Sequence, residues 1–499
     1  MTEFMINNMA PIIFASMVLF MLIGFPVAFA LAANGIFFGL VGIELGLLGP
    51  QLFQALPDRI YGVMANDTLL AIPFFTFMGL ILERSGMAED LLDTIGQLFG
   101  PLRGGLAFAV IFVGALLAAT TGVVAASVIS MGLISLPIML RYGYDKKLAS
   151  GVIAASGTLA QIIPPSLVLI IMADQLGKSV GDMYAGAFIP GFVLTGLYVG
   201  YVILIAIFKP EWVPALPLEA RSIRGVKLLL RVLTTLVPPL FLIFLVLGTI
   251  FLGIATPTEG GAMGATGALF MAIGRKRLSW KLLRQAMETT AKLTTFVVFI
   301  LVGARVFSLT FYGVDGHKWV EHLLSGLPGG QIGFLIVVNI LVFLLAFFLD
   351  FFELSFIVVP LLGPVADKLG IDLIWFGVLL AVNMQTSFMH PPFGFALFYL
   401  RSVAPPTIKT TDIYWGAIPF VCIQIIMIAL VIMFPQMVTF GLDKDVKVDL
   451  DSVQIEMPSS YYGNPATTPG QESTPADSKA AEDAANKAIM DSMKPEPAK

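Results

Sequence analysis

The stretch Ser156-Gly-Thr-Leu-Ala-Gln-Ile-Ile-Pro-Pro-Ser166 is a polar segment, broken by two prolines, inside a long apolar run. A second stretch of this kind, Asn383-Met-Gln-Thr-Ser-Phe-Met-His-Pro-Pro-Phe393, lies in the other half of the chain. The two proline pairs are 227 positions apart. Four features in matching order at one spacing indicate an internal duplication with one broken helix in each copy. The other three are Pro137 and Pro364, Gly143 and Gly370, and Asp145 and Asp372.

The composition is that of an integral membrane protein. Of the 499 residues, 57% are hydrophobic and 12% are charged, and the mean hydropathy is +0.90. A soluble domain carries about 25% charged residues. Apolar stretches long enough to cross a bilayer as helices recur from Pro11 to Val438, and the alternating pattern of a membrane barrel is absent. The sequence therefore predicts an all-α integral membrane protein.

The first nine residues lack lysine and arginine, which argues against a cleaved signal peptide.

The duplication divides the chain into two repeats, a linker and a tail. Each repeat is expected to hold scaffold helices, a hairpin and a broken helix, a plan typical of secondary transporters. The linker is basic and is expected in the cytoplasm, and the tail is too polar to fold alone and is predicted to be disordered and external. The boundaries are 1–208 for the first repeat (hairpin 104–140, broken helix 150–173), 209–231 for the linker, 232–440 for the second repeat (hairpin 331–366, broken helix 375–400) and 441–499 for the tail.

The lysine and arginine pattern bears on the number of crossings, because cytoplasmic loops carry an excess of both. About ten crossing helices and two re-entrant hairpins place every basic cluster in the cytoplasm and both termini outside. A re-entrant hairpin and two full crossings both return the chain to the same side of the membrane, so the charge pattern leaves both open. Residues 104–140 could also form one very long helix. In this topology the broken helices cross in opposite directions, so the predicted repeats are inverted. The basic clusters are 84–103, 141–147, 209–231, 275–284 and 401–409.

The two breaks are the first candidates for a binding site. Prolines leave backbone carbonyls without helical donors, and these carbonyls, with nearby hydroxyls, suit sodium. The N-termini of half-helices suit a carboxylate. The alternative is a pair of proline kinks whose hydroxyls bond their own backbone. The candidates are Ser156, Gly157, Thr158, Gln161, Pro164, Pro165 and Ser166 in the first break, and Asn383, Gln385, Thr386, Ser387, His390, Pro391 and Pro392 in the second.

The hairpin tips supply further candidates. The first tip offers small polar residues, namely Thr120, Thr121, Gly122 and Ser127. In the second, Asp350 and Glu353 interrupt a strongly apolar run, and an acid at membrane depth is by default a site hypothesis. The alternative is that both acids lie at the membrane surface or pair with Arg305.

Thr256-Pro-Thr-Glu259 has two interpretations. Thr256 as N-cap, Pro257 at the first helical position and Glu259 three residues after the cap form the pattern of a capping box. Capping is the favoured interpretation, although Glu259 could serve a site as well.

Other chemistries find little support. The three histidines have no metal-site spacing, and GxxxxGK[ST] is absent. We therefore expect no enzyme, no catalytic residue, no nucleic-acid partner and no cofactor, and no bound metal other than sodium.

Five motifs carry a family resemblance. They are Thr120-Thr-Gly-Val-Val, Gly132-Leu-Ile-Ser-Leu-Pro137, the stretch from Ala155 to Ser166, Ala255-Thr-Pro-Thr-Glu259 and Gln385-Thr-Ser-Phe-Met-His-Pro-Pro-Phe-Gly-Phe395. From about residue 10 to 440 the chain resembles the large membrane subunit of tripartite ATP-independent periplasmic (TRAP) transporters, within the branch labelled mannitol/chloroaromatic-type.

The resemblance implies a sodium-coupled importer in the bacterial inner membrane. Its substrate is expected to be a small organic anion, a carboxylate. Its expected partners are a small four-helix membrane subunit and a periplasmic substrate-binding protein. It also implies an elevator, in which the hairpins and broken helices move against a scaffold.

Two positions depart from the family pattern. Thr121-Gly-Val-Val124 offers fewer hydroxyls than the serine-rich tip of much of the family. His390 stands where the branch commonly has threonine, and both a substrate or pH role and a neutral packing role are open. The alternative function is a single-chain sodium/divalent-anion symporter with the same repeat plan. An intramembrane hydrolase using Asp350 and Glu353 is the alternative from another class.

Overall fold

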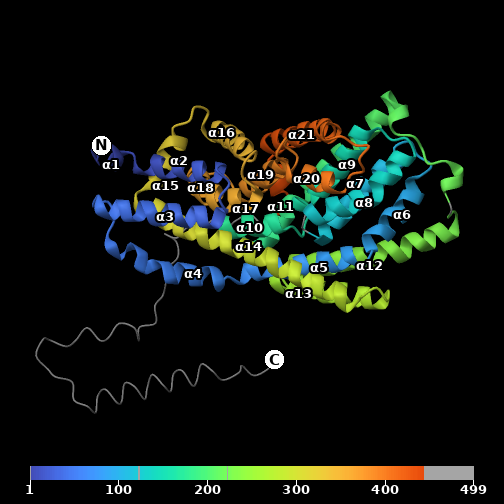
Figure 1. Ribbon diagram of the computed structural model, residues 1–499, viewed down its shortest axis with the longest axis horizontal. Helices are drawn as coiled ribbons and strands as arrows, with labels where there is room; N and C mark the ends of the chain where they lie inside the picture. Colours follow the sequence, from blue (N-terminus) through green and yellow to red (C-terminus); the bar gives the residue numbers. More distant parts are fainter. Residues whose placement is uncertain (1, 122–123, 222, 443–499) are drawn as a thin grey trace, which may run out of the picture. The chain divides into compact units, whose positions relative to one another are not determined.

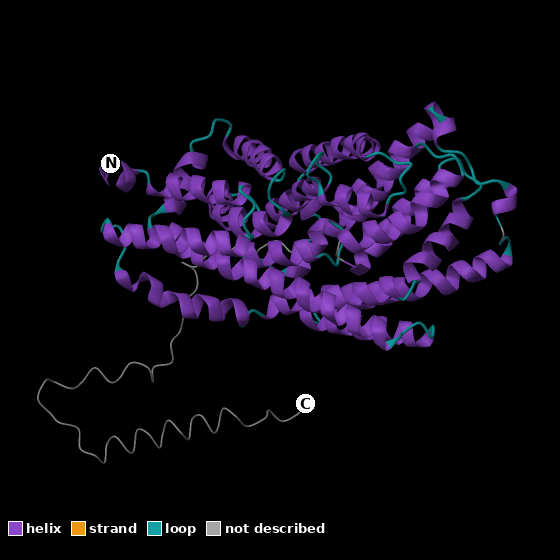
Figure 2. Cartoon of the chain, in the orientation of Figure 1, coloured by secondary structure: helices purple, strands orange, loops and turns teal. Residues whose placement is uncertain are grey.

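The computed structural model describes residues 2–121, 124–221 and 223–442. Every regular element in these ranges is a helix, and none of the described residues forms a strand (Figure 1 and Figure 2). The prediction of an all-α fold is therefore confirmed. Residues 443–499, which make up most of the predicted disordered tail, lie outside the described residues.

The helices of the two halves follow one another in the same order, with two short helices in the linker. The first half contains α1 (Thr2–Asn7), α2 (Met9–Leu22), α3 (Val27–Glu44), η1 (Pro50–Ala55), α4 (Leu56–Met64), η2 (Asp67–Leu70), α5 (Ala71–Arg84), α6 (Met87–Phe99), α7 (Gly105–Thr121), α8 (Val124–Arg141), α9 (Lys146–Thr158), η3 (Leu159–Gln161), α10 (Leu167–Leu176) and α11 (Val180–Phe208). The linker contains η4 (Pro210–Trp212) and η5 (Leu218–Ala220). The second half contains α12 (Val226–Phe251), α13 (Pro257–Gly274), α14 (Trp280–Gly313), α15 (Gly316–Ser325), α16 (Gly330–Leu345), α17 (Phe351–Glu353), the π-helical turn η6 (Leu354–Val358), α18 (Val359–Lys368), α19 (Leu373–Gln385), η7 (Thr386–Phe388), α20 (Phe395–Val403), α21 (Thr410–Met433) and α22 (Gln436–Thr439).

Several helices are long and apolar enough to cross a membrane. In the described ranges six helices meet this condition, namely α3, α8, α11, α12, α14 and α21. Two bent pairs raise the number to eight at most, one covering Pro50–Met64 and Asp67–Arg84 and the other Gly316–Ser325 and Gly330–Leu345. The breaks divide other apolar stretches into helices too short to count alone, such as Leu167–Leu176. A total of ten crossings therefore stays a prediction.

The features that recur at the 227-residue spacing occupy the same structural positions. Asp145 and Asp372 are the N-caps of α9 and α19, and their carboxylates accept hydrogen bonds from backbone N–H groups of the first turn. Gly143 and Gly370 precede these caps with φ of +82° and +72°, a left-handed conformation that favours glycine. Pro137 and Pro364 lie inside α8 and α18. Residues that are 227 positions apart therefore have the same local structural roles in the two halves of the chain.

The scaffold is built from two equivalent helix pairs. Helix α3 packs along α14, and α5 packs along α13 (Figure 1). At the 227-residue spacing α3 corresponds to α13 and α5 to α14, so each pair joins a helix of one half to a helix of the other. Glycines allow the close approach of α3 and α14: a Cβ atom on Gly35 would lie 2.8 Å from the Val306 carbonyl oxygen, and one on Gly303 would meet the Ala28 backbone. Thr310 Oγ1 also donates a hydrogen bond of 2.7 Å to the Gly35 carbonyl. Small residues and such bonds are the usual means of helix association in a membrane.

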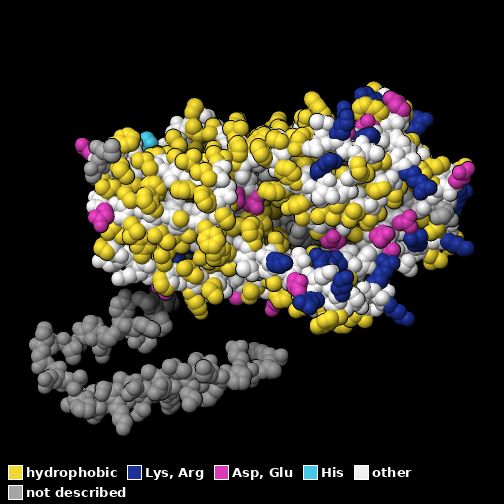
Figure 3. Space-filling model, in the orientation of Figure 1, with side chains coloured by type: hydrophobic (Ala, Val, Ile, Leu, Met, Phe, Trp, Pro, Cys, Tyr) yellow, Lys and Arg dark blue, Asp and Glu magenta, His cyan; other side chains and the backbone are white. Residues whose placement is uncertain are grey.

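The surface is mostly apolar, as a lipid-facing surface should be. Figure 3 shows hydrophobic side chains over much of the visible face, with lysine and arginine gathered toward the end formed by α6, the linker and the start of α12. There α6 is held by ion pairs, because Asp93 pairs with Arg231 at 2.7 Å and Asp90 pairs with Arg277 at 3.0 Å. Helix α6 joins the scaffold helix α5 to the first hairpin, so these pairs fasten the connection between them.

Candidate substrate and cation site

Both broken helices stop where the sequence predicts. Helix α9 ends at Thr158, continues as η3, and gives way to an irregular segment before α10 begins at Leu167. Helix α19 ends at Gln385 and continues as η7, and α20 begins at Phe395 after a similar segment. The Pro164-Pro165 and Pro391-Pro392 peptide bonds are both cis. Each broken helix thus consists of two half-helices joined by irregular backbone.

The hairpins also divide at the predicted places. Helix α7 ends at Thr121 and α8 begins at Val124, so the first stretch is two packed arms rather than one long helix. Gly122 lies outside the described residues, and the structure describes no side chain for Thr120 or Thr121. Ser127 is buried on α8. In the second stretch α16 ends at Leu345, and helical structure resumes after Asp350.

The two breaks are joined by a hydrogen bond between equivalent positions. Gln385 Nε2 donates to Thr158 Oγ1 at 3.0 Å, and these residues are 227 positions apart. Thr158 Oγ1 in turn donates to the Ala155 carbonyl at 2.8 Å. The two polar segments therefore meet, as a site formed between the copies requires.

Most hydroxyls of the breaks bond their own backbone. Thr386 Oγ1 donates to the Asn383 carbonyl at 2.6 Å, and Ser387 Oγ donates to the Met384 carbonyl at 2.7 Å. Ser166 Oγ donates to the Gln161 carbonyl at 2.5 Å and caps α10. The hydroxyl protons are thus used as expected if the breaks were simple proline kinks whose hydroxyls bond their own backbone. The lone pairs of the same oxygens remain available to a cation.

Four buried oxygens in the breaks have no hydrogen-bond partner among the described residues. They are Ser156 Oγ, Gln161 Oε1, Asn383 Oδ1 and Gln385 Oε1. Ser156 and Asn383 again correspond at the 227-residue spacing. Buried polar atoms are normally satisfied, so these oxygens fit a hard cation that is bound through oxygen. No group of three His, Cys, Asp or Glu residues suited to a metal exists in the described ranges.

A cavity of about 380 Å³ lies where the hairpins, the broken helices and α14 meet. Both hairpin tips and both breaks contribute to its wall, and α14 supplies the scaffold side. Its lining consists of Val124, Ala125, Gln161, Leu167, Val168, Leu293, Phe296, Asp350, Phe351, Phe352, Glu353, Phe388, Phe395 and Tyr399. The geometry brings together elements that are far apart in the sequence.

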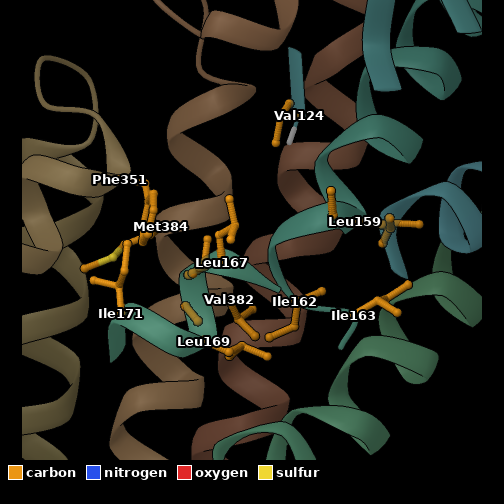
Figure 4. Close-up of a cluster of buried hydrophobic side chains, with 14 of the residues drawn as sticks. Val124, Leu159, Ile162, Ile163, Leu167, Leu169, Ile171, Phe351, Val382 and Met384 are labelled. Atoms are coloured by element: carbon orange, nitrogen blue, oxygen red, sulfur yellow. The ribbon is translucent and has the colours of Figure 1, made fainter. Parts of the chain in front are cut away.

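An apolar cluster holds these elements in place. Figure 4 shows Val124 of the first hairpin and Phe351 of the second on either side of Leu167, with Val382 and Met384 of α19 close by. All five side chains are buried. The cavity therefore rests on a continuous core shared by both halves.

The two acids of the second tip form a capping box. Asp350 Oδ1 accepts a hydrogen bond from the Glu353 N–H at 3.1 Å, and Glu353 Oε2 accepts one from the Asp350 N–H at 2.9 Å. Glu353 is 8% exposed, and both acids line the cavity. In the described part of the chain neither acid pairs with Arg305, so the alternative of an ion pair is wrong.

Other candidate residues lie away from the cavity lining. His390 is 1% exposed and lies against two rings, with its centroid 4.2 Å from that of Phe347 and 4.3 Å from that of Phe343. The Pro392 carbonyl accepts a hydrogen bond from the Tyr414 hydroxyl at 3.2 Å. His390 therefore packs among aromatic side chains behind the second hairpin.

Thr256, Pro257 and Glu259 begin α13 on the scaffold. The structure shows both bonds of a capping box, since Glu259 N–H donates to Thr256 Oγ1 at 3.2 Å and Thr256 N–H donates to Glu259 Oε2 at 2.8 Å. None of these residues lines the cavity, so the capping interpretation accounts for the motif.

Sequence reasoning missed several residues around the site. Asn339 of α16 accepts hydrogen bonds from Asn383 Nδ2 through its backbone carbonyl at 2.8 Å and its Oδ1 atom at 2.9 Å. A lone asparagine in the apolar run of α16 was a usable signal. Phe296 and Tyr399 line the cavity from helices that show no local anomaly, so nothing in the sequence marks them.

Comparison with known proteins places this geometry in a family. Residues 14–437 match the family model of the tripartite ATP-independent periplasmic transporter, DctM component. The C4-dicarboxylate TRAP transporter large permease protein DctM of Vibrio cholerae serotype O1 is 31% identical over 443 residues, which cover 84% of this chain and 94% of that protein. The protein of the same name from Pseudomonas aeruginosa is 30% identical over 403 residues, covering 80% and 91%.

The fold is similar to that of a solved transporter. The crystal structure of the Alcanivorax borkumensis YdaH transporter superimposes with a TM-score of 0.56 and 16% identity, covering 79% of this chain and 90% of that one. The likeness supports a multi-span helical transporter fold. From the family match and the identities, the chain belongs to the DctM family of TRAP transporter large permeases, which are multi-pass membrane transport proteins and not enzymes.

Proposed function

We propose that this protein is the large transport subunit of a bacterial TRAP system, and that it imports a small organic anion, a carboxylate, together with sodium. The observation that carries the proposal is the cavity walled by both hairpin tips, both breaks and α14. Such a cavity lies between elements that an elevator would move and a scaffold helix that would stay. The names of the relatives, which are C4-dicarboxylate permeases, support an organic anion as cargo.

Sodium fits the oxygens that the breaks leave unsatisfied. Ser156 Oγ and Asn383 Oδ1 are buried, unpaired and equivalent in the two copies, which favours one sodium position in each half. The carboxyl groups of Asp350 and Glu353 lie at the second tip, where a bound cation would favour their ionised form. The hydroxyls of Thr158, Thr386 and Ser387 can contribute lone pairs while donating to their own helices.

The partners follow from the family. We expect a small four-helix membrane subunit and a periplasmic binding protein, with both termini of this chain on the periplasmic side of the inner membrane. The basic residues gathered near α6 and the linker support a cytoplasmic location for that end. We also propose the mannitol/chloroaromatic-type branch, on the five motifs given in the sequence analysis, from which His390 is a departure.

Reconstitution tests the proposal. The chain is placed in liposomes with a small TRAP membrane subunit and a substrate-binding protein, and uptake of a labelled carboxylate is measured. Uptake should require an inward sodium gradient and persist without ATP. Equal uptake with choline in place of sodium would contradict the coupling. Uptake by this chain alone, without a binding protein, would instead favour the single-chain symporter.

A further inference from the structure

In the described part of the chain, the cavity between the hairpins is lined by acids and by no base. Asp350 and Glu353 are the only charged residues among the described lining residues, which include no lysine, arginine or histidine. Lys292 lies on α14 and lines an adjoining surface hollow, which shares Phe296 with the cavity but is not part of its wall. Among the described lining residues, an anion in the cavity thus meets no cationic side chain.

The rest of the wall is largely aromatic. Six rings line the cavity, contributed by Phe296, Phe351, Phe352, Phe388, Phe395 and Tyr399. Aromatic side chains favour the apolar body of a ligand and give little compensation to a second negative charge. The wall therefore suits a cargo with one polar end and an apolar remainder.

The side-chain donors that line the cavity are few. Gln161 is 2% exposed, and its amide carries an unpaired Oε1 atom, so its orientation is not fixed by a bond through that oxygen. Among the described lining residues, the other neutral polar side chain is that of Tyr399, with its hydroxyl. One amide and one phenol can donate hydrogen bonds to a single carboxylate. The N-terminus of α10 at Leu167, the positive end of that helix dipole, would also attract this carboxylate.

We propose that the cavity selects a monocarboxylate with an apolar body and rejects a dicarboxylate. The proposal rests on the proposed function and specifies its cargo. A second carboxylate would lie against the aromatic wall or near Asp350 and Glu353, and a buried charge without a partner is strongly disfavoured. Like charges brought together inside a site are a common means of rejecting the wrong ligand.

The matched pair of ligands is butanoate and succinate, which have four carbons each and differ by one carboxylate. The protein is the full chain with its single cysteine removed (Cys422→Ser) and a cysteine introduced in the cavity wall (Ala125→Cys). It is reconstituted in lipid nanodiscs together with the small membrane subunit at neutral pH, with sodium and ionic strength held equal. The rate of labelling by a small maleimide then reports occupancy of the cavity. Ala262→Cys, in a separate hollow between α13 and α14, is the control position.

Butanoate should protect the cavity cysteine at a concentration at least tenfold lower than succinate, and neither should protect the control position. If succinate protects as well as butanoate or better, the inference fails and the proposed function stands. If neither anion slows labelling of the cavity cysteine, the cavity is not a carboxylate site, and both the inference and the proposed site are overturned.

A second variant isolates the charge. Glu353→Gln keeps a residue that can complete the capping box but replaces the carboxyl group in the wall with an amide, which cannot carry a negative charge. The half-protecting concentration of succinate should fall about tenfold, corresponding to about 1.4 kcal/mol, and that of butanoate should change less. Glu259→Gln makes the same change in the capping box of α13, outside the cavity, and should leave both values unaltered. An unchanged ratio in Glu353→Gln would contradict the role of the acids.

Discussion

The Gln385 side chain donates a hydrogen bond to the Thr158 hydroxyl at 3.0 Å, and the two residues hold the same place in the two halves of the chain. Each ends the first half of its broken helix, so the bond ties one break to the other. Both residues are completely buried. The bond therefore couples the positions of the two broken helices by about 0.5–1.5 kcal/mol, the contribution of one buried hydrogen bond.

Thr158→Val should destabilise the protein, because it leaves the Gln385 amide buried without its acceptor. The expected loss is about 1–3 kcal/mol, measured as a lower midpoint of thermal unfolding in detergent. Thr195→Val is the control, since that hydroxyl bonds only its own helix and is half-buried. The double variant Thr158→Val, Gln385→Leu should recover part of the loss. Equal losses in Thr158→Val and the control would show that the bond contributes nothing.

Ser156→Ala should raise the sodium concentration needed for half-maximal uptake several-fold, because it removes one unpaired oxygen from the first break. Thr386→Ala is expected to act in the same direction in the second break. Ser402→Ala, at an exposed hydroxyl bonded to the Tyr399 carbonyl, is the control and should not change the sodium requirement. A normal sodium dependence in Ser156→Ala would remove this residue from the proposed site.

A polar contact joins the scaffold to the first hairpin. Ser130 Oγ on α8 donates to Glu83 Oε1 on α5 at 2.8 Å, and the other oxygen, Glu83 Oε2, is buried and unpaired. Ser130→Ala should lower the free energy of unfolding by about 1–3 kcal/mol, because it leaves the Glu83 Oε1 atom without its hydrogen-bond donor. Ser135→Ala on the same helix is the control. A smaller loss in Ser130→Ala than in the control would show that the contact is not a stabilising one.

The glycine contact between α3 and α14 should tolerate no side chain. Gly35→Ala places a Cβ atom 2.8 Å from the Val306 carbonyl oxygen and should destabilise the scaffold by about 1–3 kcal/mol. Gly196→Ala, in α11 with no atom within 4 Å of the new Cβ, should be neutral or should stabilise the helix by up to about 1 kcal/mol. Thermal unfolding in one detergent compares the two. Similar midpoints would show that the helices separate easily.

Much of the fold was readable because local chemistry fixes it. The pairs Pro164-Pro165 and Pro391-Pro392 lie where the two broken helices are interrupted, whereas Pro238 and Pro239 lie inside α12 without ending it. Asp145 and Asp372 cap helices through their own first turns. These signals lie within a few residues of the structure they determine, so both broken helices and both hairpin divisions were predicted to within a few positions.

The site was less readable because it depends on contacts between distant segments. Nothing near Gln385 in the sequence indicates that its amide meets Thr158, and nothing marks Phe296 as a cavity residue among the other aromatic residues of α14. His390 was a conspicuous residue, yet packing from α16 and the segment after it places it between Phe343 and Phe347. Such relationships arise only when the helices assemble.

The capping box of Asp350 and Glu353 has a consequence for how this transporter can diverge. The same two side chains start a helix at the second tip and set the charge of the cavity wall. Any substitution that changes the charge also threatens the start of that helix, except exchange for the matching amides. A mutation at either acid therefore affects both the cargo preference and the folding of the hairpin. A change of specificity at this tip is best tolerated when asparagine replaces Asp350 or glutamine replaces Glu353.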